Sequence, residues 1–238
     1  MKAVILAGGF GTRLRSVVSD LPKPLAPVNG KYFLEYLLEQ LKTNGIYEFI
    51  FCVHYMADKI MNHFGNGERF GVRIDYSVET EPLGTGGAIG LCRQMISETF
   101  CVLNADTYLD LDIQDCLRRH QGSGAFLTMA VAHMVDTGRY GQVQIQTDGR
   151  IGGFEEKGAP GSKSGYINAG FYIVEPRIFT YIPPIQNVSL EQDVFPAFFR
   201  WAEKINSYSN VEHFFDIGVP EDYYRFQRWI DERKLADG

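Results

Sequence analysis

Long hydrophobic runs, paired cysteines and clustered histidines are all missing from this chain of 238 residues. No apolar stretch reaches the roughly 20 residues that a membrane-spanning helix needs, so we expect no membrane partner. The four cysteines, Cys52, Cys92, Cys101 and Cys116, lie in or beside apolar segments without the spacing of a metal site. Because no signal peptide precedes them, we expect reduced core thiols and a cytoplasmic protein. The five histidines are also unpaired in spacing, and we expect them to be structural or solvated.

The chain has no excess of positive charge either. Its 23 Lys and Arg residues stand against 29 Asp and Glu residues, a formal net charge of −6. Nucleic-acid-binding proteins usually carry a basic surface, so we expect no nucleic-acid partner. A small phosphate ester in a locally basic pocket stays compatible with an acidic exterior. With 45% hydrophobic residues and no shift in composition that marks a linker, residues 1–238 are expected to form a single domain.

A glycine-rich stretch near the start predicts a phosphate-binding loop. Lys2 to Ala7 reads as a short strand, and a loop with three glycines, Thr12 and Arg13 follows it. Glycines in such a loop let backbone N–H groups approach an anion closely. The prolines on either side of Lys23 restrict that backbone to extended conformations and direct one ammonium group. A glycine-rich surface turn with a solvated arginine is the plain alternative.

Two better-known phosphate motifs do not match this loop. The Walker pattern needs Gly-Lys-Ser or Gly-Lys-Thr, which the stretch lacks. The dinucleotide-binding pattern needs a small residue where Leu14 stands, which disfavours an NAD-binding oxidoreductase.

Strand-like and helical segments alternate through the first half of the chain. Strands are expected at 47–53, 72–78 and 100–103, and helices at 31–43, 58–64 and 86–96. This alternation predicts an α/β fold with a doubly wound, mixed but mostly parallel sheet. Ligands of such sheets bind beyond the carboxyl ends of the strands, so the glycine loop and residues 79–85 and 104–106 are expected along one rim.

The second half predicts antiparallel structure and two more helices. Strands are expected at 125–132, 142–146, 151–154 and 166–174, with a hairpin turn at Asp148-Gly149. We expect this hairpin to form a small antiparallel flap over the sheet. Ser189 opens a capping box for a helix toward Lys204. Pro220 is expected to begin a terminal helix that buries Tyr224, Phe226, Trp229 and Ile230.

Short motifs along the whole chain resemble those of the sugar nucleotidyltransferases. They are Gly-Phe-Gly-Thr-Arg before Pro-Lys-Pro, Glu81–Ala88, Asn104–Asp106, Arg139–Gly141, Phe154–Lys157, Asn168–Gly170 and Phe215–Tyr223. The chain is similar to a short bacterial branch that includes heptose 1-phosphate guanylyltransferases. This resemblance implies a Rossmann-like nucleotidyltransferase fold, with a nucleotide-binding half at about 1–110 and a sugar-phosphate-binding half at about 111–238.

Two aspartates follow hydrophobic segments and are candidates for a metal site. Asp106 and Asp216 each end an apolar run, where a carboxylate is poorly solvated unless it meets a cation. A pair of carboxylates with substrate phosphates and water suits Mg²⁺. The alternative is that each caps a helix or a turn. The resemblance favours the metal, because both match the two metal-binding aspartates of the family.

The resemblance implies that an oxygen of a sugar 1-phosphate attacks the α-phosphorus of a nucleoside triphosphate and expels pyrophosphate. A phosphate monoester, with a second pKa near ~6, needs no general base for this. The implied catalytic residues are Arg13, Lys23, Asp106, Lys157 and Asp216. Those for the nucleotide are Leu6, Gly8, Gly9, Gly11, Thr12, Arg13, Glu79, Gly84 and Thr85. Those for the sugar phosphate are Lys23, Gly141, Glu156, Lys157 and Asn168. Arg69 and Arg139 read as solvated loop residues.

Glu79 favours guanine as the base. A carboxylate has only acceptors, and guanine offers adjacent N1–H and N2–H donors, whereas uracil and thymine place one N–H between two carbonyls. Glu81 is a second candidate for this contact with the base. The alternative is that Glu79 and Glu81 are both solvated acidic residues of a loop.

We therefore expect guanylyl transfer from GTP to a sugar 1-phosphate, with D-glycero-α-D-manno-heptose 1-phosphate first. A mannose-1-phosphate guanylyltransferase, a uridylyltransferase and a catalytically silent nucleotide-sugar-binding subunit stay open, as does a homodimer.

Overall fold

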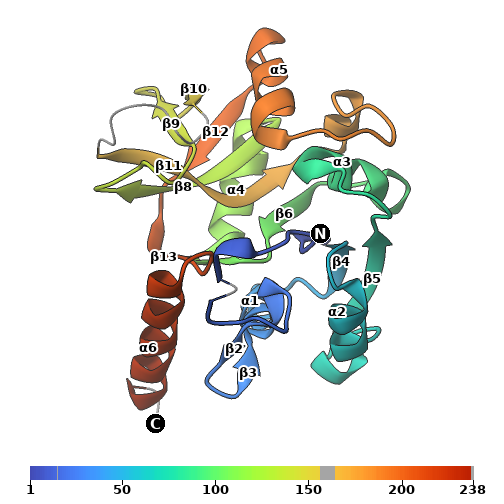
Figure 1. Cartoon of the computed structure of the whole chain (residues 1–238). Coiled ribbons are helices and arrows are strands. Elements are labelled where there is room, and N and C mark those ends of the chain that lie inside the picture. Colours follow the sequence, from blue (N-terminus) through green and yellow to red (C-terminus); the bar gives the residue numbers. More distant parts are fainter. Residues whose placement is uncertain (15, 156–163, 237–238) are drawn as a thin grey trace.

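The computed structural model describes residues 1–14, 16–155 and 164–236. A nine-stranded sheet runs through the molecule in the order β10-β9-β11-β6-β1-β4-β5, with β8 beside β11 and β12 beside β8 (Figure 1). Its strands from the first half of the chain are β1 (Ala3–Leu6), β4 (Glu48–Val53), β5 (Arg73–Val78) and β6 (Phe100–Asn104), and all of these pair in parallel. The strands expected from apolar periodicity in the first half are thus confirmed.

The helices of the first half also lie where they are expected. They are α1 (Phe33–Thr43), α2 (Ala57–Phe64) and α3 (Gly84–Leu91). Helix α1 begins two residues later than expected, because β3 (Lys31–Tyr32) pairs with β2 (Pro27–Val28). Helix α3 ends before Ile96 and continues as a 3-10 turn, Cys92–Met95.

The long strand β11 (Gly165–Val174) joins the two halves of the chain, because it runs antiparallel to β6. The predicted hairpin forms from β9 (Gln142–Ile145) and β10 (Ile151–Glu155) and pairs with β11. It therefore extends the edge of the large sheet. Strands β8 (Leu127–Met134) and β12 (Ile205–Tyr208) complete that sheet.

A small second sheet carries one of the two candidate metal ligands. Strand β7 (Thr107–Leu111) pairs antiparallel with β13 (Val211–Asp216), so residues about 100 positions apart meet directly after Asp106. Helix α4 (Ile113–Ser123) follows β7. Neither β7 nor α4 was expected from the apolar pattern.

The last two helices begin as their sequences predict. The Ser189 hydroxyl accepts a hydrogen bond from the Gln192 N–H at 3.1 Å, and the chain then makes a π-helical turn, Leu190–Val194, before α5 (Phe195–Arg200). Helix α6 (Pro220–Ala236) starts at its proline. One prediction for α6 is wrong, because the Tyr224 side chain is 45% exposed and its neighbour Tyr223 is buried instead.

Two hydrophobic cores lie on opposite faces of the large sheet. Along β1, the side chains of Ala3 and Ile5 pack into one core and that of Val4 into the other, as the two-residue period of a strand requires. Helices α1, α2, α4 and α6 contribute to the first core, and α3 and α5 to the second. All four cysteines are buried and free. Within the described ranges, every helix is too short or too polar to cross a bilayer.

Candidate functional site

Two cavities meet at the carboxyl ends of the parallel strands, where the fold predicts a ligand. The first, of about 450 Å³, is lined by the glycine loop and by residues that follow β4, β5 and β6. The second, of about 440 Å³, lies toward β7, β9, β11 and β13. Both cavities are lined by Gly84, Thr85, Asn104 and Asp106. Ligands in the two cavities would therefore meet beside Asp106.

Each glycine of the first loop has a distinct structural role. A Cβ on Gly8 would lie 3.1 Å from Oε1 of Glu79, so this backbone packs directly on that carboxylate. Gly9 lines the first cavity, and a Cβ there would meet no described atom within 4 Å. Gly11 has a positive φ of 58° and faces the Lys23 side chain. The loop thus presents open backbone at Gly9, while the other two glycines, Gly8 and Gly11, pack against the protein.

Glu79 lies in the wall of the first cavity and is 7% exposed. Its Oε2 accepts a hydrogen bond from the Leu83 N–H at 2.9 Å, and its own backbone oxygen lies 2.9 Å from Nδ1 of His54. Burial raises the pKa of Glu79, although the Leu83 N–H and His54 act in the opposite direction. The carboxylate therefore supports the 79–83 turn with one oxygen while its other oxygen lies against Gly8.

A cluster of charged side chains surrounds Gly218 beside the junction of the cavities. A Cβ on Gly218 would lie 2.7 Å from Oδ1 of Asp216, 3.2 Å from Nζ of Lys23 and 3.3 Å from Nη2 of Arg13. The Gly218 N–H donates to that same Oδ1 at 2.8 Å. Only glycine leaves room for these groups to converge.

The pKa values of the two aspartates in this cluster are shifted in opposite directions. Burial raises the pKa of Asp216, and the negative charge of Asp106 adds to this effect. Burial also acts to raise the pKa of Asp106, but the charge and hydrogen bond of Lys23 outweigh it and lower that pKa. The two carboxylates are thus close enough to repel each other, which a divalent cation between them would relieve.

The donor chemistry at Asp106 and Asp216 fits Mg²⁺, which prefers carboxylate oxygens. Among the described residues, no group of three or more His, Cys, Asp and Glu side chains is arranged to hold a metal ion. A cation at this pair would therefore take its other ligands from substrate phosphates and water.

Thr85 connects α3 to the segment before α5. Its hydroxyl donates to Oε2 of Glu191 at 2.8 Å and accepts from the Leu190 N–H at 2.9 Å. Gly84 has a φ of +72°, and a Cβ there would lie 2.6 Å from the Val188 oxygen. Both residues line the cavities and also hold the two segments together.

Asn168 lines the second cavity with both polar atoms already bonded. Its Nδ2 donates to the Tyr172 hydroxyl at 2.7 Å, and its Oδ1 accepts from the Gly170 N–H at 3.0 Å. Its backbone N–H donates to the Gly141 oxygen at 2.9 Å. A Cβ on Gly141 would lie 2.5 Å from the Phe154 ring, so this glycine is required for packing.

The structure distributes the predicted site residues over both cavities. The first cavity is lined by Leu6, Gly8, Gly9, Glu79, Gly84, Thr85 and Asp106. The second is lined by Arg13, Gly84, Thr85, Asp106, Gly141, Asn168 and Asp216. Lys23 reaches Asp106 at the junction, and Gly11 and Thr12 belong to the loop that leads to Arg13. Glu156 and Lys157 lie outside the described residues.

Several residues of the cavities were not among the predicted site residues. Asn104 lines both cavities, and its position at the carboxyl end of β6 is the signal that marks it. Phe10, half exposed at the rim of the first cavity, places its ring against His54 and Tyr55. The prediction that Arg139 is merely solvated is wrong, because it forms an ion pair with Asp222 at 2.8 Å.

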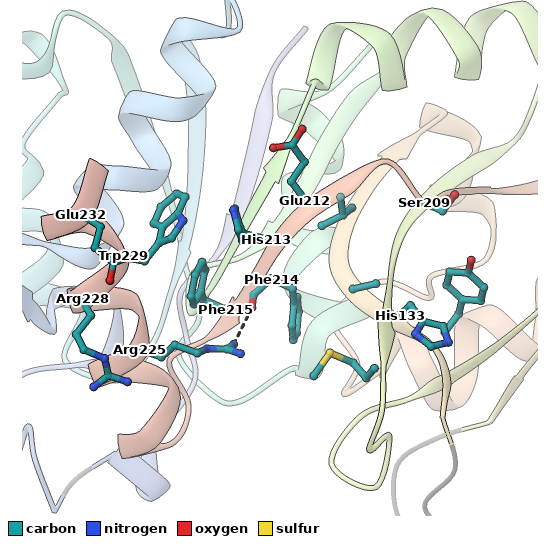
Figure 2. A pocket seen from close by; sticks show the side chains of 14 residues that line it. His133, Ser209, Glu212, His213, Phe214, Phe215, Arg225, Arg228, Trp229 and Glu232 are labelled. Carbon is teal, nitrogen blue, oxygen red and sulfur yellow. Dashed lines mark hydrogen bonds between the residues drawn. The ribbon is translucent and has the colours of Figure 1, made fainter. Parts of the chain in front are cut away.

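A third cavity, of about 530 Å³, lies on another side of β13, between α6 and β8 (Figure 2). Rings of His213, Phe215 and Trp229 line it together with Arg225. None of the predicted site residues is part of its lining.

Comparison with known proteins identifies this arrangement. A family model described as nucleotidyl transferase matches residues 2–233. The chain belongs to the nucleotidyl transferase family. The doubly wound α/β sheet expected for this family is the fold that the chain has.

Relatives of similar length share much of the nucleotidyl transferase sequence. The chain is 41% identical over 229 residues to a D-glycero-alpha-D-manno-heptose 1-phosphate guanylyltransferase of Aneurinibacillus thermoaerophilus, covering 96% of this chain and 97% of that protein. It is 39% identical over 226 residues to the protein of the same name from Campylobacter jejuni, covering 95% and 98%. A mannose-1-phosphate guanylyltransferase of Mycobacterium tuberculosis is 34% identical, but the match covers 62% of its length and 94% of this chain.

Crystal structures of HddC from Yersinia pseudotuberculosis resemble this nucleotidyl transferase over nearly the whole chain. The TM-score is 0.84 at 35% identity, and the match covers 96% of this chain and 99% of that one. One of the HddC structures is a complex with GMP-PN.

Proposed function

We propose that this protein transfers a guanylyl group from GTP to a sugar 1-phosphate, with D-glycero-α-D-manno-heptose 1-phosphate as the preferred acceptor. The observation that supports this most is the near-full-length identity of about 40% to two heptose 1-phosphate guanylyltransferases. The products are a GDP-sugar and pyrophosphate. Residues of about 1–110 bind the nucleotide in this proposal, and residues of about 111–238 bind the sugar phosphate.

The first cavity is the proposed site of the nucleotide. Open backbone at Gly9 leaves room for phosphates, and Glu79 lies in the wall as an acceptor for the guanine N1–H and N2–H groups. Gly84 and Thr85 lie on the same wall, where their backbone would contact the base. Gly11 and Thr12 shape the loop, and Arg13 and Lys23 bring positive charge to the junction.

The second cavity is the proposed site of the acceptor. Its wall contains Gly141 and Asn168, whose polar groups suit sugar hydroxyls. Each of the two Asn168 polar atoms keeps capacity for one further hydrogen bond. We assign Glu156 to the sugar hydroxyls and Lys157 to the acceptor phosphate on the strength of the family motif, since both lie outside the described residues.

Asp106 and Asp216 are the residues that we propose to hold Mg²⁺. When bound, Mg²⁺ would neutralise phosphate charge where donor and acceptor meet. Lys23 and Arg13 neutralise further charge as the two anionic substrates approach and pyrophosphate leaves. No side chain needs to remove a proton, because a phosphate monoester is already largely dianionic at neutral pH. Catalysis then depends on in-line positioning and charge neutralisation.

The experiment that tests this proposal is a matrix of nucleoside triphosphates against sugar 1-phosphates, with pyrophosphate release and product mass as readouts. We expect GTP with heptose 1-phosphate to give the highest kcat/KM. Equal or better turnover with UTP would contradict the guanylyl assignment. A preference for mannose 1-phosphate would favour the second candidate, which the Mycobacterium tuberculosis relative supports. No turnover with any pair would favour a catalytically silent subunit.

Location in the cytoplasm and a homodimer stay predictions from the sequence and the family resemblance.

A further inference from the structure

Arg139 is a charged residue of the second cavity that the proposed reaction does not yet use. It lies in the loop between β8 and β9, next to Tyr140 and Gly141, and its side chain is 44% exposed. The described residues that line this cavity include three carboxylates, those of Asp106, Glu191 and Asp216, but only two cations, Arg13 and Arg139. An acceptor phosphate that enters this cavity needs a positively charged group there, because the carboxylates of the lining repel it.

The protein holds the Arg139 guanidinium through one of its terminal nitrogens, Nη2. Its Nη2 donates to Oδ2 of Asp222 at 2.8 Å and to the Tyr140 hydroxyl at 3.0 Å, and its Cζ lies 5.3 Å from the Tyr140 ring centre. Within the described residues, its Nη1 and Nε donate to no other group. The guanidinium therefore keeps N–H donors for a ligand while its orientation is set by the protein.

Asp222 is well placed to fix this orientation. It is 6% exposed, lies in the first turn of α6, and comes six residues after Asp216. It also forms an ion pair with Arg225 at 3.2 Å. The Tyr140 ring packs edge-on against Phe214, with 5.4 Å between ring centres, so the Arg139 loop is fixed to β13 as well. Partial burial acts to lower the pKa of Arg139, but Asp222, Tyr140 and Asp216 together raise it.

We propose that Arg139 binds the phosphate of the sugar 1-phosphate acceptor and that Asp222 positions its guanidinium for this contact. A guanidinium suits this role because its parallel N–H groups match two phosphate oxygens. This inference rests on the proposed function only in that the acceptor is a sugar 1-phosphate. It applies whichever sugar and whichever nucleobase the enzyme prefers.

Arg225 provides a matched control, because it shares Asp222 but faces away from the acceptor cavity. Its Nη2 donates to the Phe214 oxygen at 2.8 Å, its Cζ lies 4.8 Å from the Phe215 ring centre, and it lines the third cavity (Figure 2). Replacing Arg225 removes one positive charge and one Asp222 partner, as replacing Arg139 does. Only the loss of Arg139 removes a guanidinium from the acceptor side.

The test measures steady-state kinetics of Arg139→Ala, Arg139→Lys, Asp222→Asn and Arg225→Ala, with melting temperatures for each. We expect Arg139→Ala to raise the acceptor KM by about 10-fold or more, the loss typical of a charge-assisted hydrogen bond, with the GTP KM unchanged. Arg139→Lys should recover part of the loss, because a lysine restores the charge but not the fork. Asp222→Asn should raise the acceptor KM less than Arg139→Ala does. Arg225→Ala should leave it unchanged.

Two kinetic results would overturn the inference. One is an acceptor KM in Arg139→Ala equal to that of the unmodified enzyme, and the other is an equal rise in Arg225→Ala, which would indicate a general loosening of α6. If the unmodified enzyme prefers a different triphosphate or sugar, the same variants are compared with that pair, so the proposed function fails separately. Calorimetric binding of the sugar 1-phosphate makes the same comparison without turnover, and equal Kd values for Arg139→Ala and the unmodified protein would contradict our proposal.

Discussion

The Nζ of Lys23 lies 2.5 Å from Oδ2 of Asp106, at the place where the first and second cavities meet. This ion pair keeps the Asp106 carboxylate ionised, since Lys23 lowers its pKa against the effect of burial. In the absence of a metal, the Lys23 ammonium neutralises the negative charge of Asp106, as a bound cation would. Binding of Mg²⁺ and phosphates would free Lys23 to contact a phosphate oxygen.

Replacing either aspartate of the pair should abolish most activity without unfolding the protein. We expect Asp106→Asn and Asp216→Asn each to lower kcat by orders of magnitude, because the amide is a poor Mg²⁺ ligand. Activity against Mg²⁺ concentration, before and after EDTA, measures this. Asp110→Asn is the control, since Asp110 lies in β7, the strand that follows Asp106, but pairs with Arg233 at 3.3 Å. Full activity of either active-site variant in EDTA would contradict the metal assignment.

Asp216→Asn should stabilise the metal-free protein at neutral pH. The pKa of Asp216 is raised, chiefly by burial and then by Asp106. A carboxyl with a raised folded pKa contributes stability below its unfolded pKa, near ~3.9, and loses that contribution as the pH rises through the folded value. The variant should therefore melt higher than the unmodified protein at pH 7, and the difference should vanish near pH 4. Each kcal/mol corresponds to ~2–4 °C in a domain of this size.

Addition of Mg²⁺ provides the reciprocal measurement. The melting temperature of the unmodified protein should rise with Mg²⁺, because the cation binds the ionised carboxylates of Asp106 and Asp216. The melting temperature of Asp216→Asn should rise little. Equal Mg²⁺ stabilisation of both proteins would show that the cation binds elsewhere.

Glu79→Gln should weaken GTP use more than UTP use. Its amide keeps an acceptor for the Leu83 N–H, so the 79–83 turn should survive, but its NH₂ group opposes the guanine donors. We expect kcat/KM for GTP to fall by about 10-fold or more. Glu81→Gln is the matched control, because Glu81 lies in the same turn and is exposed. If both substitutions have the same effect, Glu79 does not read the base.

Gly9→Ala should impair nucleotide binding without affecting stability. A Cβ at this position meets no described protein atom within 4 Å, and Gly9 lines the cavity that we assign to the nucleotide. We expect the GTP KM to rise on the order of 10-fold, because backbone at such a site approaches phosphate closely, while the melting temperature stays the same. Gly122→Ala also meets nothing within 4 Å, but Gly122 lies on α4, outside the lining of both cavities, and the substitution should leave the KM unchanged.

The parts of the fold that follow local pattern were predictable from the sequence. The apolar run before the glycine loop forms β1, and the glycines and polar residues after β1, β5 and β6 meet at one rim, as parallel strands require. Strand β7 was not expected, because it follows β6 after only two residues and four of its five residues are buried. Such a short segment shows no alternation of apolar and polar residues that would mark a separate strand.

Side-chain roles in the site were less predictable than its location. Arg139 looks solvated in the sequence, yet its partner Asp222 lies 83 positions away on α6. Asn168 looks available to a sugar, yet the Tyr172 hydroxyl and the Gly170 N–H already bond to its amide. For Arg139, a tertiary contact that nearby residues do not encode decides the role of the side chain. For Asn168, the partners lie two and four residues along the same strand, where the pairing of β11 with β8 shifts register, and the apolar pattern does not reveal that irregularity.

The shared wall of Gly84, Thr85, Asn104 and Asp106 has a consequence for inhibitor design. A molecule that joins a guanosine group to a sugar through a linker across this wall would occupy both cavities at once. Linking makes the second contact intramolecular, so affinity gains from effective concentration without any new interaction. The GDP-sugar product is itself such a molecule, and its two ends must leave two cavities before the next cycle begins. A tethered inhibitor would bind the free enzyme as this product does and would compete with both substrates.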